Sequence, residues 1–399
     1  MLDYKKWSQP AYTSGVTGLT AYRNLLRLPV MASLREMFRA IARQDPGWTD
    51  HYCDAFYALA EEGYSALGDY LRDHMLYDES PFALAAAKGE DTSVLFRAAG
   101  SDINRLNHHL LVLPWEELCS AQASDVAWGL PQWERKTLPD VSFFRDFYRQ
   151  NGCGQFARYH AFVWQDGQLY PVQHPDCVPA DQLVGYQRQR DQVIANTRTL
   201  LAGHRVNNML LYGSSGTGKS ATVKALLAME GMENLRLIEV DKEELTGIPE
   251  LVRMLGHQPQ KFILFIDDLA FDKDDRNYSL LKTILEGSVE PRPDNVAVYA
   301  TSNRRHLVRE TFSDRLGDEV DANETIQEKT SLSERFGLRV LFQELTKPQF
   351  LNLIRQLAKL RGITMEEQQL MALAVRWDVR NPNRTPRSAV QFIDSLATL

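Results

Sequence analysis

The chain has 399 residues, too many for one ordinary hydrophobic core, and its length therefore predicts two or three domains. Hydrophobic residues make up 44% and charged residues 24%, a balance that excludes a largely disordered chain. The net charge is -7 and no long Lys/Arg block occurs, which disfavours a dedicated nucleic-acid binder. No apolar run approaches the roughly 20 residues of a membrane span, and the polar first ten residues lack the features of a secretion signal.

The acidic excess lies mainly in the first part of the chain. Residues 1–178 carry 16 Lys and Arg against 22 Asp and Glu, whereas the remainder carries 29 against 30.

The cysteines are too widely spaced for a CxxC metal or redox pair: Cys53, Cys119, Cys153 and Cys177. We therefore expect reduced thiols in a cytoplasmic protein.

The first ~150 residues have a mostly helical pattern. Apolar residues recur at helical spacing from Tyr52 to Leu71, with Asp and Glu between them, and Thr49 or Asp50 is a candidate cap for that helix. Such a stripe is typical of a core face, and a face that docks a partner is the alternative.

A change of pattern follows residue 158. Tyr159 to Val172 predicts a β-hairpin whose turn is Asp166-Gly167. A Pro-containing link, Pro175 to Pro179, comes next and is the expected domain boundary. The mainly helical N-terminal domain is accordingly predicted to span residues 1–178, with the hairpin and the linker at its end.

From Gln182 onward, short apolar runs alternate with helical stretches. The runs are Met209 to Tyr212, Leu235 to Val240, Phe262 to Asp267, Val296 to Thr301 and Arg339 to Leu345. This alternation predicts an α/β domain over residues 179–345, with a parallel sheet of five strands and helices on both faces.

The chain is predicted to be helical again from Thr346 onward. Thr364 with Glu367 resembles a capping box, and Thr385 before Pro386 predicts another helix start. Residues 346–399 are therefore expected to form a helical C-terminal region.

Residues 213–220 match the phosphate-binding P-loop pattern without a gap. The loop follows an apolar strand and precedes a helix, which is the context that the motif requires. Backbone N–H groups and the helix N-terminus would surround the phosphates, Lys219 would reach the β- and γ-phosphates, and Ser220 would ligate Mg²⁺. In the empty site, the side chain of Lys219 is expected to face solvent. The expected nucleotide contacts are Gly213, Ser214, Ser215, Gly216, Thr217, Gly218, Lys219, Ser220 and Ala221.

A second acidic signal follows the run Phe262 to Ile266. A buried strand of this kind delivers Asp267 to its C-terminal end, where the carboxylate would hold Mg²⁺ through water. Asp268 is either the group that positions the attacking water or a cap of the following turn. Because Asp is one methylene shorter than Glu, slow hydrolysis is expected. Three further acids, Asp272, Asp274 and Asp275, favour a solvated loop over extra metal ligands.

Taken together, these motifs resemble the AAA+ superfamily of ATPases. Within it, the chain is similar to a bacterial group of predicted ATPases catalogued as a domain of unknown function. The resemblance covers about Gln182 to Leu399 and includes four segments: Leu183 to Tyr186, Asp267 to Leu269, Tyr299 to Leu307 and Leu332 to Gly337. It implies that residues 179–345 form a nucleotide-binding α/β domain and that residues 346–399 form its helical lid. It also implies ATP and Mg²⁺ as cofactors and a homo-oligomeric ring of about six subunits.

The resemblance also implies roles for individual residues. Val184, Gly185 and Tyr186 would line the adenine pocket. Asn303 resembles the sensor of the γ-phosphate, with a turn residue as the alternative, and Arg335 resembles an arginine finger, with a surface ion pair as the alternative. Arg387 resembles the second sensor, and Arg384 is its rival.

Three functions are compatible with this pattern. The first is an oligomeric ATPase that remodels or switches a protein partner through its acidic N-terminal domain. The second is a nucleic-acid-associated helicase loader or transposition helper, which the Asp-Asp-Leu run also resembles, although the charge distribution predicts weak DNA binding. The third is a nucleotide-gated binding module with negligible turnover. A threading unfoldase is disfavoured because Asp241 to Lys261 contains no aromatic residue.

Overall fold

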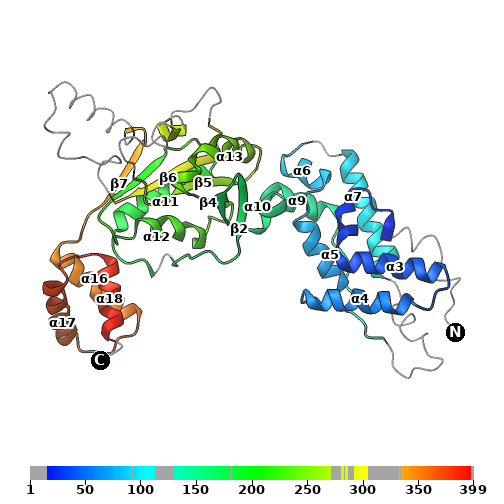
Figure 1. Cartoon of the computed structure of the whole chain (residues 1–399), viewed down its shortest axis with the longest axis horizontal. Helices are drawn as coiled ribbons and strands as arrows, with labels where there is room; N and C mark the ends of the chain where they lie inside the picture. Colours follow the sequence, from blue (N-terminus) through cyan, green and yellow to red (C-terminus); the bar gives the residue numbers. More distant parts are fainter. Residues whose placement is uncertain are drawn as a thin grey trace. The chain divides into compact units, whose positions relative to one another are not determined.

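The structure is a computed structural model that describes residues 16–90, 93–112, 130–179, 182–270, 280–282, 284, 285, 292–303, 332 and 334–396. The chain divides into a helical unit, Met1–Arg158, and an α/β unit, Tyr159–Leu399, each with its own core (Figure 1). This division lies earlier than the expected boundary at residues 175–179, because the hairpin belongs to the α/β unit. Among the described residues, no helix has both the length and the apolar character to cross a membrane.

The helical unit packs its helices around one apolar core. In chain order its elements are η1 Arg23–Arg27, α3 Pro29–Ala42, α4 Trp48–Glu61, α5 Leu67–Leu76, α6 Pro81–Ala87, α7 Ser93–Leu106, the π-helix η2 Asn107–Leu111, α9 Val141–Asn151 and α10 Gly154–Arg158. The buried carboxylate of Asp102 on α7 accepts hydrogen bonds from the backbone N–H groups of Thr20, Ala21 and Tyr22. These bonds attach the segment before η1 to α7.

The apolar stripe of the sequence covers two helices instead of one. Gly63 adopts a φ of 82° after α4, a left-handed conformation that suits glycine and ends the helix before α5 begins. The expected caps are also wrong, since the N-cap residue of α4 is Gly47. The side chain of Asp45 accepts a hydrogen bond from the Gly47 N–H at 2.9 Å. Most of the stripe is core, with Tyr52 and Leu71 fully buried.

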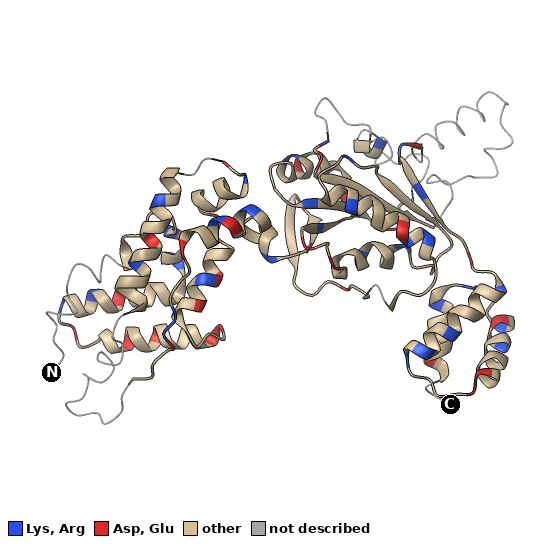
Figure 2. Cartoon of the chain, turned by 180° about the vertical axis from the view of Figure 1, so that it is seen from behind, with Lys and Arg blue, Asp and Glu red and all other residues tan. Residues whose placement is uncertain are grey.

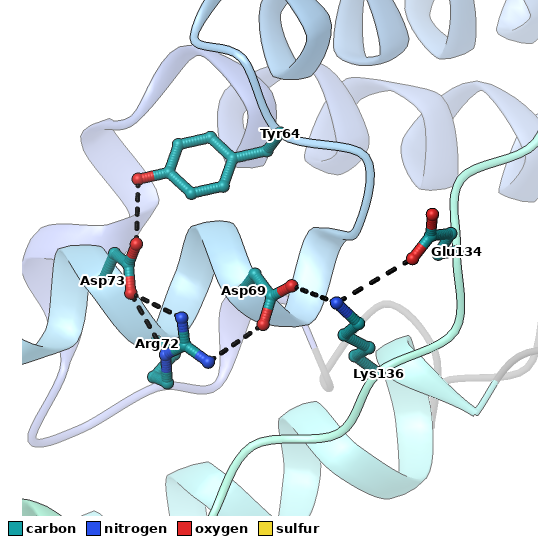
Figure 3. A network of polar contacts seen from close by, with 6 residues as sticks. All are labelled: Tyr64, Asp69, Arg72, Asp73, Glu134 and Lys136. Carbon is teal, nitrogen blue, oxygen red and sulfur yellow. Dashed lines mark hydrogen bonds and ion pairs between the residues drawn. The ribbon is translucent and has the colours of Figure 1, made fainter.

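Residues 130–138 cross α5 as an extended segment. Trp133 stacks on Tyr52 with ring centroids 5.0 Å apart. A Cβ atom on Gly68 would lie 2.1 Å from the carbonyl oxygen of Lys136, so only glycine allows this approach. Figure 3 shows the polar network beside it: Tyr64, Asp69, Arg72, Asp73, Glu134 and Lys136. Because these groups are half-buried or exposed, the network fixes the register of the segment more than it stabilises the fold.

The α/β unit is built on a seven-stranded sheet. Its strands are β1 Ala161–Gln165, β2 Gln168–Val172, β3 Met209–Gly213, β4 Leu235–Val240, β5 Lys261–Ile266, β6 Val296–Ser302 and β7 Leu338–Phe342, in the order β2-β1-β4-β5-β6-β3-β7. All neighbours are parallel except the hairpin β1–β2. The five expected parallel strands and the hairpin, with positive φ at Asp166 and Gly167, are confirmed. The sheet has two more strands than expected because β1 pairs with β4.

Helices accompany this sheet and form the lid. They are α11 Gln187–Leu201, α12 Lys219–Lys224, η4 Ala225–Ala228, η5 Lys242–Gly247, α13 Ile248–Leu255, α16 Lys347–Leu360, α17 Glu367–Arg380 and α18 Pro386–Leu396. Strand β6 is buried along its whole length, as a central parallel strand covered on both faces requires. The last three helices share their own apolar core, in the region where the resemblance implies a lid.

Two helix starts in the lid differ in how well the sequence predicted them. The N-cap residue of α17 is Glu366, without a side-chain cap, so the capping box of Thr364 and Glu367 is wrong. Thr346 and Gln349 form such a box at α16 instead. The start of α18 is confirmed, because the Ser388 N–H donates to Thr385 Oγ1 at 3.3 Å.

Candidate nucleotide-binding site

The P-loop follows β3 and leads into α12. Gly213 has a φ of 129°, and a Cβ atom there would lie 2.1 Å from the Phe342 carbonyl oxygen. Only glycine therefore fits at the start of the loop, where it passes β7. Gly216 and Gly218 also have positive φ, at 75° and 90°. Thr217 closes the loop by donating its hydroxyl to the Ser214 carbonyl at 2.8 Å. This conformation suits a loop whose N–H groups turn inward toward an anion.

The sequence led us to expect Lys219 to face solvent. This expectation is wrong, because the residue is only 6% exposed. Its ammonium donates to the carbonyl oxygens of Gly213 at 3.0 Å and Ser214 at 2.8 Å, and to Asn303 Oδ1 at 2.9 Å. Burial lowers the pKa of Lys219, and the carboxylates of Asp268 and Asp267 oppose that shift. This long side chain therefore folds back on the nearest acceptors of the loop.

Ser220 and Asp267 lie side by side at the end of β5. The Ser220 hydroxyl donates to Asp267 Oδ1 at 2.6 Å. The same carboxylate oxygen accepts from the hydroxyl of Thr301 on β6 and from the Asp268 N–H at 3.2 Å. Hydroxyl and carboxylate oxygens are the ligand types that Mg²⁺ prefers, directly or through water, so this pair fits the metal that accompanies a nucleotide.

Asp268 and Asn303 meet across the ends of β5 and β6. The Asn303 amide Nδ2 donates to Asp268 Oδ1 at 2.7 Å, while its Oδ1 accepts from Lys219. Asp268 adopts a left-handed backbone with φ at 49°. The structure thus joins three residues that the sequence had assigned to one reaction centre, and it reveals Thr301 beside them, a contact that the sequence pattern did not indicate.

The three residues expected at the adenine pocket line a cavity of about 340 Å³ together with Thr217, Gly218 and the lid. Tyr186 adopts φ at 53°, stacks at a tilt on Phe342 and donates its hydroxyl to the Gln343 carbonyl at 2.6 Å. Burial raises the pKa of Tyr186 to about 12. The cavity is large enough for a ligand-sized group.

Arg387 and Arg384 occupy different environments. The Arg387 N–H donates to the Gly216 carbonyl at 3.2 Å, which brings the start of α18 onto the P-loop. Arg384 is paired within the lid, with its Nε 2.7 Å from Asp378 Oδ1 and its NH2 3.1 Å from Oδ2. The structure therefore brings Arg387 to the P-loop, whereas Asp378 holds Arg384.

Arg335 lies away from its own P-loop. It precedes β7, which runs parallel to β3 with Leu338 opposite Met209 and Phe342 opposite Gly213. Arg335 therefore lies toward the N-terminal ends of the strands, and the P-loop lies at their C-terminal ends. Among the described strands, β7 also lies at the edge of the sheet. The acids Asp272, Asp274 and Asp275 lie outside the described residues.

This sheet, this loop and these C-terminal helices have the arrangement of an α/β P-loop fold, as expected from the resemblance to the AAA+ superfamily. The family described as "Protein of unknown function (DUF815)" matches residues 157–399, more than half of the chain. The chain therefore belongs to that family, and the match begins near the boundary between the two units.

Solved structures with a similar fold include two kinds of protein. The Thermotoga maritima RuvB Holliday junction branch migration motor is 16% identical with a TM-score of 0.37, over 55% of this chain and 64% of that chain. The Aeropyrum pernix ORC2 protein, solved as ADPNP–ADP complexes, is 15% identical with a TM-score of 0.40, over 56% and 64%. The chain thus covers less than two thirds of these relatives. Among curated proteins, none matches the chain.

Proposed function

We propose that the protein binds ATP with Mg²⁺ and hydrolyses it. The observation that carries this proposal is the convergence of the P-loop, Asp267, Asp268 and Asn303 at one end of the sheet. The loop N–H groups and Lys219 would hold the phosphates, and Ser220 with Asp267 would hold the metal. Bound Mg²⁺ would offset the charge of the β- and γ-phosphates.

Asp268 is the candidate group that orients the attacking water. Its carboxylate is anchored by Asn303, whose other amide atom contacts Lys219. When Lys219 binds phosphates instead of Asn303, the Asn303 carbonyl oxygen becomes free to accept a hydrogen bond from water. Asn303 would thereby report nucleotide occupancy to Asp268.

A second candidate function is a nucleotide-gated binding module with negligible turnover. The 2.7 Å bond between Asn303 and Asp268 favours it, because a carboxylate held this way is less available to a water. The two functions separate in one experiment: phosphate release from ATP by purified protein, compared with Lys219→Met. Turnover that depends on Lys219 supports the ATPase, and tight ATP binding without release supports the module.

We further propose that Arg335 acts on a neighbouring subunit. Its position at an edge strand, toward the end opposite the P-loop, supports a role in trans. An arginine that offsets transition-state charge contributes about 10³ to 10⁵ in rate in other phosphoryl-transfer systems. Arg335→Ala and Lys219→Ala should each be inactive, and mixing them should restore part of the activity if ATP assembles subunits into a ring.

Two outcomes would contradict this role of Arg335. One is a protein that stays monomeric with an ATP analogue and Mg²⁺ at high concentration. The other is an Arg335→Ala variant with undiminished turnover. Arg339 on β7 is an exposed arginine close to Arg335 in the sequence, so Arg339→Ala serves as the matched control substitution and should keep the wild-type turnover.

The output of the cycle is proposed to be the switching or remodelling of a protein partner through the helical unit. The acidic balance of residues 1–178 supports a protein partner over nucleic acid. Figure 2 shows Lys and Arg interspersed with Asp and Glu on the drawn helices of both units. Affinity capture with Asp268→Asn in ATP and in ADP tests the idea, because only the ATP state should retain the partner. A salt-sensitive complex with duplex DNA would favour the loader alternative.

A further inference from the structure

Thr301 lies at the centre of the acidic end of the sheet. It is on β6, 2% exposed, and its hydroxyl donates to Asp267 Oδ1. The hydroxyl oxygen of Thr301 also accepts from the Asp268 N–H at 2.9 Å, and the Thr301 carbonyl accepts from the Leu269 N–H at 2.7 Å. One residue of β6 therefore engages three consecutive residues after β5.

This arrangement fixes the chain where it leaves β5. Asp268 has a φ of 49°, a conformation that is sparsely populated for residues other than glycine and needs support from its surroundings. The hydrogen bond from the Asp268 N–H to Thr301 supplies that support. The left-handed turn brings the Asp268 carboxylate to Asn303.

The hydroxyl also orients Asp267. Three donors converge on Asp267 Oδ1: the hydroxyls of Ser220 and Thr301 and the Asp268 N–H. Because one carboxylate oxygen is fixed in this way, the carboxylate plane is fixed too. Groups that orient a metal-binding carboxylate typically change metal affinity or activity by about 10- to 100-fold when they are removed.

We propose that Thr301 is a positioning residue that orients both acids, Asp267 for the metal and Asp268 for the water, through its hydroxyl group. The inference rests on the proposed function. The neighbouring Ser302 cannot replace it, because successive side chains of a strand point to opposite faces of the sheet.

The test compares Thr301→Val, which keeps the shape and removes the hydroxyl, with Thr301→Ser, which keeps the hydroxyl. The affinity for a non-hydrolysable ATP analogue is measured with Mg²⁺ and with EDTA. In Thr301→Val, the gain in affinity from Mg²⁺ should fall by about 10-fold or more, while the affinity in EDTA stays unchanged. Thr301→Ser should behave like the wild type.

Thr197→Val is the matched control for a buried threonine. Thr197 is 0% exposed and its hydroxyl contacts the Val193 carbonyl at 2.8 Å and the Tyr299 hydroxyl at 2.9 Å, away from the acids. Its loss should reduce thermal stability without changing the Mg²⁺ dependence of binding. If Thr301→Val does not fold, Thr301→Ala and Thr301→Ser provide the same comparison.

Two results would overturn the role of Thr301: a Thr301→Val protein with the wild-type Mg²⁺ dependence, or a Thr301→Ser protein as impaired as Thr301→Val. Both would leave the proposed function standing, because wild-type binding of the analogue would still depend on Mg²⁺. A wild-type protein that does not bind the analogue would overturn the proposed function and the role of Thr301 together.

Discussion

Replacing Lys219 distinguishes the contribution of this residue to nucleotide binding from its contribution to the stability of the fold. Without nucleotide, Lys219→Met loses three hydrogen bonds from a cation to the Gly213, Ser214 and Asn303 oxygens. A hydrogen bond to a charged group contributes about 1.5–3 kcal/mol to stability. Removal of a partly dehydrated ammonium offsets part of that loss, so we expect a net cost of about 1–3 kcal/mol.

Nucleotide should then act differently on the two proteins. At a concentration 100 times the Kd, ATP with Mg²⁺ stabilises the wild type by about 2.7 kcal/mol. For a unit of this size that corresponds to a rise of about 5–10 °C in Tm. Lys219→Met should show no such rise, because the phosphates lose their charged contact.

Lys224 on the same helix provides the control. It forms an ion pair with Glu239 at 3.2 Å on the surface, so Lys224→Met should keep the nucleotide-dependent rise. The assay is a thermal melt monitored with and without ATP and Mg²⁺. A folded Lys219→Met protein with the wild-type rise would refute the assignment of the phosphate site.

Three further predictions follow from the same geometry. Asp268→Asn should bind ATP with near-normal affinity, since Asp267 still serves the metal, and should release phosphate more slowly by about 100-fold; equal turnover would remove Asp268 from the mechanism. Arg387→Ala should weaken nucleotide binding or turnover, whereas Arg384→Ala should lower the stability of the lid because its contact with Asp378 is lost. Binding and melting experiments test this, and the reverse pattern would exchange the roles of the two arginines. Burial and the nearby Arg236 lower the pKa of His160, so protonation favours the unfolded state and the α/β unit should lose stability as pH falls below about 6.5. In urea unfolding, the free energy of unfolding of His160→Asn should fall less between pH 7.5 and 5.5 than that of the wild type. An identical fall in the two proteins would contradict this prediction.

Local patterns made the convergence of the candidate phosphate-site residues predictable from the sequence. The P-loop is contiguous, and each acid or amide follows directly after a buried strand, so parallel strands had to bring these side chains to one edge. The hairpin was predictable because Asp166-Gly167 accepts the positive φ values of a tight turn.

Long-range pairing was not predictable in the same way. Nothing in the hairpin sequence specified that β1 would pair with β4, so the sheet was expected to be smaller and the boundary later. The contact of Thr301 with Asp267 joins residues 34 positions apart, and its signal was only that a threonine lies near the end of β6. Lys219 was misjudged because the acceptors that bury it come from the loop backbone and from Asn303.

A single-turnover measurement tests the central claim most directly. Excess protein is mixed with ATP labelled at the γ-phosphate, in the presence or absence of Mg²⁺. Bound ATP, ADP and free phosphate are then followed in time. The account predicts one ATP bound per chain and its conversion to ADP and phosphate only when Mg²⁺ is present. ATP that stays unbound at millimolar protein, or that is converted equally well by Lys219→Met, would contradict it.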